Sequence, residues 1–588
     1  MRKLLDTFTT FFKSKTGHWV LIGSVLLIST GFRLFFLSYG NILGDEPLYS
    51  IRSIGLLDTL GSPIQTTPLD WFETLPWWAH LSFHDHPPLV FWIHHLFFEI
   101  LGSSLLAQRL PSALFGIASV ILSYFLGKKL YDKKFGLAMM LMMAINNFAI
   151  FYSRVVMMES ITLFFILLGF YFFVKSTEDN KWLPWWGLCV GISVLSKYVG
   201  FFLLPAYFLY IILYKRNWLK DVRFYIAIGL GILVFSPVII YNIQMYRSVG
   251  HFDLQFAFLL QQDFSMHWQE LPGKTQRGSL LVRLQGIGGM LYTYSPLFFF
   301  FALCGFMTPI LKKSIKEHVS HVDWLFFFVT VSMVGFMFLV GSGTRFLSYT
   351  TPFLIYLIIR FYQYFCSSFR WLTPLCIIFL LFECFFSYNT ILASGESAVG
   401  LPFLMYPTQL TIEDSGDTAL DKHLNHELRG YTSKKLPQVE NKSIMKVIEQ
   451  FHQPSKNERN VMLVFDPRIN ITTLNYVFLK RTFYEGWPIT YTEQVPHIFQ
   501  SDTEIPGDLT LYYVHALPPS NRDDEYSTNG LHPDELLSIL LQLDTPRQPV
   551  YNRHGHLTYW VFELAPRHIQ KMISQIHDYA ASSQATPR

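Results

Sequence analysis

Long apolar runs separated by short polar segments dominate the chain up to about residue 390. A helix of roughly 20 apolar residues crosses a hydrocarbon core about 30 Å thick. The pattern therefore predicts a polytopic α-helical membrane protein with about 11 to 13 transmembrane helices. The expected spans lie at about 18–38, 105–126, 136–151, 160–175, 183–196, 199–213, 224–242, 289–310, 323–341, 350–362 and 371–391.

Basic clusters between the runs indicate on which side of the membrane each connection lies, because Lys and Arg are enriched in cytoplasmic connections. The three clearest clusters are GKKLYDKK (127–134), YKRNWLKDVR (214–223) and LKKSIKEH (311–318). Placing all three inside gives a cytoplasmic N-terminus and an extracytoplasmic C-terminus. The first run follows basic residues, as in a signal peptide, but lacks a small-residue cleavage site, so we expect an uncleaved span.

The run PPLVFWIHHLFFEIL (87–101) is short and carries His94, His95 and Glu99. Such side chains are costly in lipid. A crossing here would also place the cluster 127–134 outside. We therefore expect an amphipathic helix in the outer membrane interface.

This threading leaves two long segments outside the membrane, a first loop at about 39–104 and a large loop at about 243–288. Beyond residue 400 the chain becomes polar, with short strand-like runs VMLVFD, LTLYYVHAL and LTYWVFEL. We expect residues 1–399 to form the membrane domain. Residues 400–588 should form a soluble α/β or α+β domain outside the membrane.

Composition supports the membrane assignment. Hydrophobic residues make up 51% of the chain and charged residues 15%, against about 25% charged in typical soluble proteins. The net charge of +4 is too small and dispersed to indicate a nucleic-acid partner. The five cysteines lie in or beside apolar runs and form no CxxC pair, so neither a disulfide framework nor a cysteine metal site is predicted.

Charged residues gather at the outer face of the predicted bundle. GDEPLYS places Asp45 and Glu46 where the first span emerges, although an acid pair after a glycine is also common in ordinary turns. YSRVVMMES brings Arg154 and Glu159 to the same level. We expect these four residues to border one outer cavity.

Four further side chains are expected on the same face. Lys197 in LSKYVG either snorkels to the interface or binds an anion. His86 in DHPPL is a phosphate-binding candidate or an ordinary surface histidine. Arg345 and Tyr349 in GTRFLSYTTPF are binding candidates, or a snorkelling arginine and an interface tyrosine.

Carboxylates and cations facing one cavity suit the displacement of a phosphate leaving group. A carboxylate would take a proton from the acceptor, while the cations would stabilise the charge that develops on the departing phosphate. No P-loop or GxGxxG motif follows a predicted strand. The donor is therefore expected to come from the membrane.

The motifs GDEPLY, DHPPLVFW, RLPSALFGI, YSRVVMMES, LSKYVG and RFLSYTTPF, in this order, resemble the bacterial GT-C glycosyltransferases related to protein O-mannosyltransferases and the lipid A aminoarabinose transferase. The resemblance covers about residues 18–360. It implies inverting transfer of a sugar from a polyprenyl-phosphate donor to a protein, lipid A or envelope glycan at the outer face of the bacterial cytoplasmic membrane.

Carried onto this chain, the resemblance makes Asp45 the base and Glu46 its acidic neighbour, although the two could exchange roles. Glu159 takes the second acidic position, where many members have Asp, and Lys197 takes the position near the lipid phosphate. His86 stands where some members have a lysine. Tyr198 follows Lys197 where glycine is frequent, and the resemblance does not extend to the C-terminal domain.

A metal is not part of the expected chemistry. His84 and Asp85 adjoin His86, and His251 or His267 could approach from the large loop, but consecutive residues rarely ligate one ion together. The alternative function is a transporter or flippase of a lipid-linked glycan, which predicts inverted repeats and charges at bilayer depth. A non-catalytic anchor would need neither the acids nor the lysine. The identities of the sugar, the polyprenol and the acceptor stay open.

Overall fold

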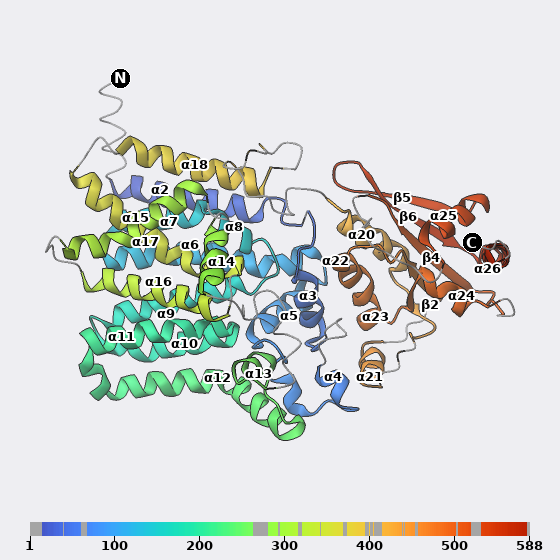
Figure 1. Ribbon diagram of the computed structural model, residues 1–588, viewed down its shortest axis with the longest axis horizontal. Coiled ribbons are helices and arrows are strands. Elements are labelled where there is room, and N and C mark those ends of the chain that lie inside the picture. The colour runs from blue at the N-terminus through green and yellow to red at the C-terminus, as the bar shows by residue number, and fades with distance from the viewer. Residues whose placement is uncertain are drawn as a thin grey trace. The chain divides into compact units, whose positions relative to one another are not determined.

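The computed structural model divides into two compact units that interleave along the chain. The first comprises Met1–Ser38 and Trp77–Thr411, and the second comprises Tyr39–Pro76 and Ile412–Arg588. Figure 1 labels their elements. The structure describes residues 14–38, 40–59, 67–262, 280–291, 295–314, 320–340, 343–368, 373–393, 399, 401, 404, 414–437, 439, 442–452, 457–500, 504–518 and 531–584.

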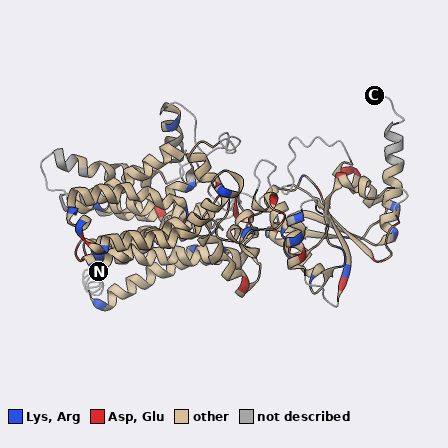
Figure 2. Cartoon of the chain, turned by 90° about the horizontal axis from the view of Figure 1, so that it is seen from below, with Lys and Arg blue, Asp and Glu red and all other residues tan. Residues whose placement is uncertain are grey.

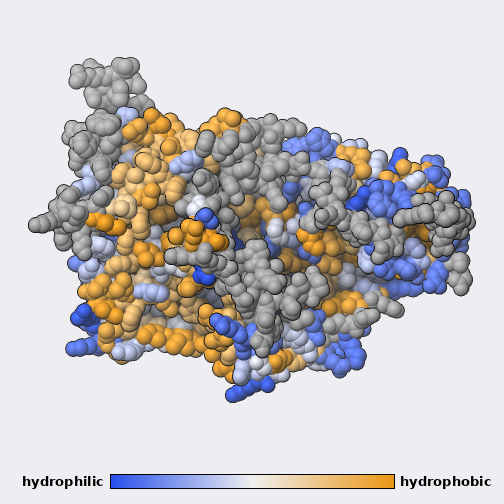
Figure 3. All heavy atoms as spheres, viewed as in Figure 1, coloured by the Kyte–Doolittle hydropathy of each residue, from blue (hydrophilic) through white to orange (hydrophobic). Residues whose placement is uncertain are grey.

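The described part of the first unit is helical. Six of its helices are long and apolar enough to cross a membrane. Charged residues are sparse along these helices (Figure 2), and hydrophobic side chains cover much of the visible face (Figure 3). The main helices are α2 (Lys15–Leu34), α5 (Leu89–Leu101), α6 (Leu105–Leu130), α7 (Lys133–Ile145), α8 (Asn147–Tyr152), α9 (Glu159–Ser176), α10 (Leu183–Ser196), α11 (Leu204–Tyr214), α12 (Val222–Val249), α13 (Leu254–Leu259), α14 (Leu280–Leu291), α15 (Pro296–Ser314), α16 (His321–Val340), α17 (Leu347–Ser368) and α18 (Thr373–Ile391).

The predicted polytopic helical fold is confirmed, and the third expected span differs locally from the prediction. The run 136–151 forms two helices, α7 and α8, separated at Asn146. The Asn146 side chain accepts a hydrogen bond from the backbone N–H of Ala149 at 3.1 Å, so it caps the second helix. Asparagine favours such caps over helix interiors, which explains the break.

The helix expected at 87–101 is present as α5. Its buried side chains include Val90, Phe91, His94 and Phe98, and it packs against α6. Glu99 is exposed. His94 therefore lies inside the protein.

The second unit contains a six-stranded mixed sheet with strand order β1-β2-β4-β6-β5, in which β3 also pairs with β2. Strands β1, β3 and β4 run parallel to β2, whereas β6 runs antiparallel to β4 and β5. The three runs predicted as strands are β2, β4 and β6. The strands are β1 (Thr432–Ser433), β2 (Glu458–Phe465), β3 (Ile489–Tyr491), β4 (Leu509–Ala516), β5 (Arg547–Tyr551) and β6 (Leu557–Leu564).

Helices accompany this sheet, and a core that includes Leu511, Leu540, Phe562 and Ile569 joins the sheet to α24, α25 and α26. Leu463 of β2 pairs with Tyr512 of β4, which fixes the register of the central strands. The helices are α20 (Asp417–Leu428), α21 (Lys442–Phe451), α22 (Ile471–Thr473), α23 (Lys480–Glu485), α24 (Val495–Ile498), α25 (Pro533–Gln542) and α26 (Pro566–Gln584).

Residues 39–76, the start of the first loop, fold with the C-terminal part of the second unit. The segment contains α3 (Glu46–Gly55) and α4 (Pro68–Trp71). The hydroxyl of Tyr484 donates to the carbonyl oxygen of Ile51 at 2.5 Å. Leu57 and Leu69 pack with Val447 of α21 in a small apolar cluster. This segment is thus fixed by residues distant in sequence.

Candidate functional site

A buried ion pair joins the start of α9 to the end of α10. The Lys197 Nζ lies 2.5 Å from Glu159 Oε1, and both side chains are buried. Glu159 is the first residue of α9, whereas Lys197 follows the last residue of α10 in an extended conformation. The two helices pack along their length. Two residues chosen independently from the sequence are therefore in direct contact.

Aromatic rings border the same ammonium group. The Lys197 Nζ lies 5.8 Å from the ring centre of Phe346 and 5.9 Å from that of Tyr349. The Arg345 guanidinium lies 5.6 Å from the centre of the same Phe346 ring. Such distances are those of cation–π contacts. The structure thus places Tyr349 beside the lysine, and both Lys197 and Arg345 lie near the ring of Phe346, which the sequence analysis did not select.

Arg154 lies in the turn between α8 and α9 and is buried. One of its terminal nitrogens donates to the carbonyl oxygen of Phe32 at 2.8 Å, so the guanidinium is tied to the end of α2. The charge of Arg154 also acts on Arg33 of α2. The structure therefore places Arg154 at a helix end inside the first unit, next to a second buried arginine.

Arg33 is a residue that the sequence analysis passed over. It is fully buried, and its two terminal nitrogens donate to the carbonyl oxygens of Ala144 at 3.1 Å and Met143 at 3.0 Å. The available signal was an arginine within the first apolar run, since ionisable residues inside membrane spans are rare and commonly functional.

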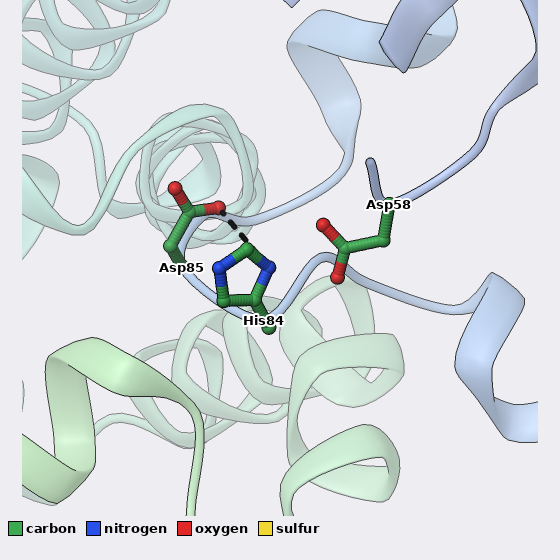
Figure 4. Close-up of side chains that lie close together, drawn as sticks. All are labelled: Asp58, His84 and Asp85. Carbon is green, nitrogen blue, oxygen red and sulfur yellow. Dashed lines mark ion pairs between the residues drawn. The ribbon is translucent and has the colours of Figure 1, made fainter. Parts of the chain in front are cut away.

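The DHP motif forms a second cluster of titratable groups. The Asp85 carboxylate lies 2.9 Å from His86 Nδ1 and 3.9 Å from His84 Nδ1. Figure 4 shows the His84 imidazole beside the Asp85 carboxylate. His86 is partly exposed, and its ring is held by its own neighbour. These three side chains are of types that can bind a divalent metal. His267, which the sequence analysis considered as a further ligand from the large loop, lies outside the described residues.

Asp253 joins this cluster from the large loop, and the sequence analysis did not select it. Its Oδ2 accepts hydrogen bonds from the Tyr198 hydroxyl and from the Asn242 amide at 3.1 Å. The next backbone N–H, of Leu254, donates to the carbonyl oxygen of His84 at 2.7 Å. Burial raises the pKa of Asp253 to about 6. Nothing in the local sequence indicated this contact.

The two acids of GDEPLYS belong to the second unit, at the start of α3. Glu46 is fully buried, and its Oε2 accepts a hydrogen bond from the backbone N–H of Leu43 at 2.8 Å. Asp45 is partly exposed, and its Oδ2 accepts from the Tyr49 hydroxyl at 3.2 Å. The structure therefore distinguishes two acids that the sequence could not rank. Glu46 is buried and fixes the turn, whereas Asp45 is partly exposed.

Comparisons with known proteins bear on this arrangement. Residues 85–241 match the family model of dolichyl-phosphate-mannose-protein mannosyltransferases. The putative mannosyltransferase YycA of Bacillus subtilis is 28% identical over 169 residues, which are 28% of this chain and 24% of that protein. The putative mannosyltransferase YkcB of the same organism is 26% identical over 202 residues, 33% of this chain and 28% of that protein. The matches thus span only about a quarter of these relatives.

The fold matches a solved structure over nearly the whole chain. ArnT from Cupriavidus metallidurans bound to undecaprenyl phosphate has a TM-score of 0.52 and 13% identity, covering 94% of this chain and 98% of that chain. The apo form of the same protein matches with a TM-score of 0.51. These findings confirm the resemblance predicted from the motifs: the chain has a GT-C-like fold and, over residues 85–241, the sequence pattern of the protein mannosyltransferase family.

Proposed function

We propose that the chain is an inverting glycosyltransferase that transfers a sugar from a polyprenyl-phosphate donor to an acceptor at the outer face of the bacterial cytoplasmic membrane. The buried Lys197 ammonium, held by Glu159 and sharing the Phe346 ring as a neighbour with Arg345, is the observation that carries the proposal. A cation kept desolvated at a helix end favours an anionic group more strongly than one in water. The likeness to ArnT, whose solved structure contains undecaprenyl phosphate, supports a lipid phosphate as that anion.

In the proposed reaction, Asp45 accepts the proton of the acceptor hydroxyl. The acceptor oxygen forms a bond to the anomeric carbon from the face opposite the phosphate, and the bond between that carbon and the phosphate oxygen breaks. The electron pair of the broken bond leaves with the polyprenyl phosphate. Lys197 and Arg345 stabilise the charge on this leaving group, and Glu159 keeps the lysine in place.

The remaining residues have supporting roles in this proposal. Tyr349 borders the lysine, Arg154 holds the end of α2, and Glu46 fixes the turn that presents Asp45. His86 is a candidate for contact with the donor phosphate when its ring leaves Asp85. The proposed reaction requires no metal. The acceptor is a protein, lipid A or another envelope glycan, and the second unit is assigned to its recognition.

Transfer from defined lipid donors tests this function. The purified full chain, in detergent or nanodiscs, is incubated with radiolabelled undecaprenyl-phosphate hexoses and pentoses and an envelope extract from cells lacking the gene. We expect label from one donor to enter the extract, together with release of undecaprenyl phosphate. Asp45→Asn protein serves as the control. Absence of transfer from every lipid-linked sugar, or equal transfer by the variant, contradicts the proposal.

A further inference from the structure

A small cavity lies behind the Glu159–Lys197 pair, inside the first unit. It has room for about one water molecule. Its walls include Arg33, Ser119, Tyr152, Glu159, Ser160 and Ser348. Glu159 thus lines the cavity whereas Lys197 does not, and the lining combines the arginine with a carboxylate residue.

Two side-chain atoms of this lining have complementary unmet hydrogen-bonding capacity. Among the residues that the structure describes, neither the Nε of Arg33 nor the Oε2 of Glu159 has a hydrogen-bond partner, and both side chains are fully buried. The first atom is a donor, and the second is an acceptor. Leaving a buried charged group unsatisfied costs more than leaving a neutral one, so each of these atoms is expected to have a partner.

The three serine hydroxyls of the lining donate elsewhere. Ser160 donates to the carbonyl oxygen of Ser112 at 2.7 Å, Ser119 donates to that of Phe115 at 2.9 Å, and Ser348 donates to that of Arg345 at 2.7 Å. Their oxygens can still accept. The cavity therefore offers one cationic donor, one anionic acceptor and additional acceptor oxygens, which is the kind of surrounding that holds a buried water.

The position of Arg33 is fixed by its other nitrogens. Its terminal nitrogens bond to Met143, Ala144 and the Ser29 hydroxyl, the last at 3.1 Å. A methyl group on Gly116 would stand 3.2 Å from Arg33 Nε and would collide with the Ser153 side chain. These hydrogen bonds thus hold the guanidinium in place. The absence of a side chain at Gly116 leaves room for it.

We propose that Arg33 is a positioning residue: its Nε–H and Glu159 Oε2 bind one shared water molecule, which orients Glu159 so that its other oxygen holds the Lys197 ammonium. Arg33 then acts on the lysine through the water and the carboxylate. The consequence for donor binding rests on the proposed function, because Lys197 is assigned there to the lipid phosphate.

Thermal unfolding of the purified full chain tests the link without relying on activity. Arg33→Gln, Glu159→Gln and the double variant form one cycle, and groups joined in one network show non-additive effects. We expect the double variant to be little less stable than the worse single variant. Arg109→Gln combined with Glu159→Gln is the matched control, because Arg109 is a buried arginine that bonds to the Leu37 carbonyl and does not line the cavity. That pair should be additive. Additive effects in the Arg33 cycle would overturn the proposal.

Binding of undecaprenyl phosphate supplies a readout that a purely structural arginine would not move. We expect Arg33→Gln to raise the dissociation constant by roughly tenfold in the wild-type background. In the Lys197→Met background the same change should have no further effect. An equal effect in both backgrounds would overturn the positioning role. If the wild type binds no undecaprenyl phosphate, the proposed function fails, and the thermal cycle still decides the link.

The wild-type protein provides a third measurement if Arg33→Gln does not fold. A density map at about 2 Å resolution should show an ordered water within hydrogen-bond distance of both Arg33 Nε and Glu159 Oε2. A map that resolves other buried waters but shows none here would overturn the proposal.

Discussion

The ammonium group of Lys197 contacts the carboxylate of Glu159 at 2.5 Å, with both side chains withdrawn from solvent. Removing one partner of a buried ion pair leaves the other charge uncompensated, which typically costs about 3 to 5 kcal/mol. The pair therefore joins the stability of the α9–α10 contact to the site proposed for the donor phosphate. The two contributions can be separated by substitution.

The first prediction concerns this pair. Lys197→Met should destabilise the protein by about 3 kcal/mol, because Glu159 loses its partner in a buried place. The double variant Lys197→Met, Glu159→Gln should regain much of that stability, since no unpaired charge is left. Neither variant should bind lipid donor normally. Thermal unfolding and donor titration measure the two effects, and wild-type donor affinity in the double variant would make the lysine purely structural.

The second prediction separates the two acids of the first loop. Glu46→Gln keeps an oxygen that can accept from the Leu43 N–H, so the turn should persist. We expect the transfer rate to fall by less than about tenfold, well below the 10² to 10⁴ attributed to a general base. The transfer rate of the Glu159→Gln variant should lie between the rates of the Glu46→Gln and Asp45→Asn variants. A larger loss in Glu46→Gln than in Asp45→Asn would exchange the roles of the two acids.

The membrane spans were predictable from sequence because a bilayer imposes a length and an apolar composition on every crossing helix. The break at Asn146 was not expected, since its cap to Ala149 is a single polar contact within an apolar run. The strands β2, β4 and β6 were also predictable, because each is a compact β-branched and aromatic run between polar segments.

Contacts between residues distant in sequence could not be predicted from the pattern of hydrophobic and polar positions. Membrane threading placed Glu159 and Lys197 on one face, but their pairing depends on how α9 and α10 pack. The hydrogen bond from Tyr484 to Ile51 depends on the tertiary fold, which the local hydrophobic periodicity does not determine. Arg33 carried a visible signal, a charge within an apolar run, whereas Asp253 carried none.

The third prediction concerns topology. Cysteine at Ser103, which is exposed just after α5, should react with an impermeant thiol reagent from the same side of the membrane as cysteine at Asp45. Cysteine at Lys220, in a basic connection, should react only from the opposite side. Labelling of Ser103→Cys from the side opposite Asp45→Cys would mean that α5 crosses the membrane and that the proposed threading shifts by one span, which would bring Lys220→Cys to the side of Asp45→Cys.

The fourth prediction is a pH effect in the second unit. Burial lowers the pKa of His515, which lies 3.4 Å from Asp466 and 3.8 Å from Asp534. A histidine with a lowered folded pKa takes up its proton more readily when unfolded, so stability falls as the pH drops below the unfolded pKa of about 6.5. The melting temperature should therefore fall between pH 7 and pH 5, and His515→Gln should reduce that slope. An unchanged slope in the variant would assign the effect to other groups.

The central claim is that Asp45 is the base that activates the acceptor. Asp45 is partly exposed, and asparagine differs from aspartate only in having an amide nitrogen in place of one carboxylate oxygen. Asp45→Asn should therefore leave the fold and donor binding intact while removing the group that accepts the proton. Loss of general-base catalysis should slow transfer by about 10² to 10⁴, which corresponds to about 3 to 5 kcal/mol of barrier. The most direct test is single-turnover transfer from an undecaprenyl-phosphate sugar by purified Asp45→Asn protein shown to bind that donor. A rate reduced within this range is expected, and a wild-type rate would contradict the assignment of Asp45.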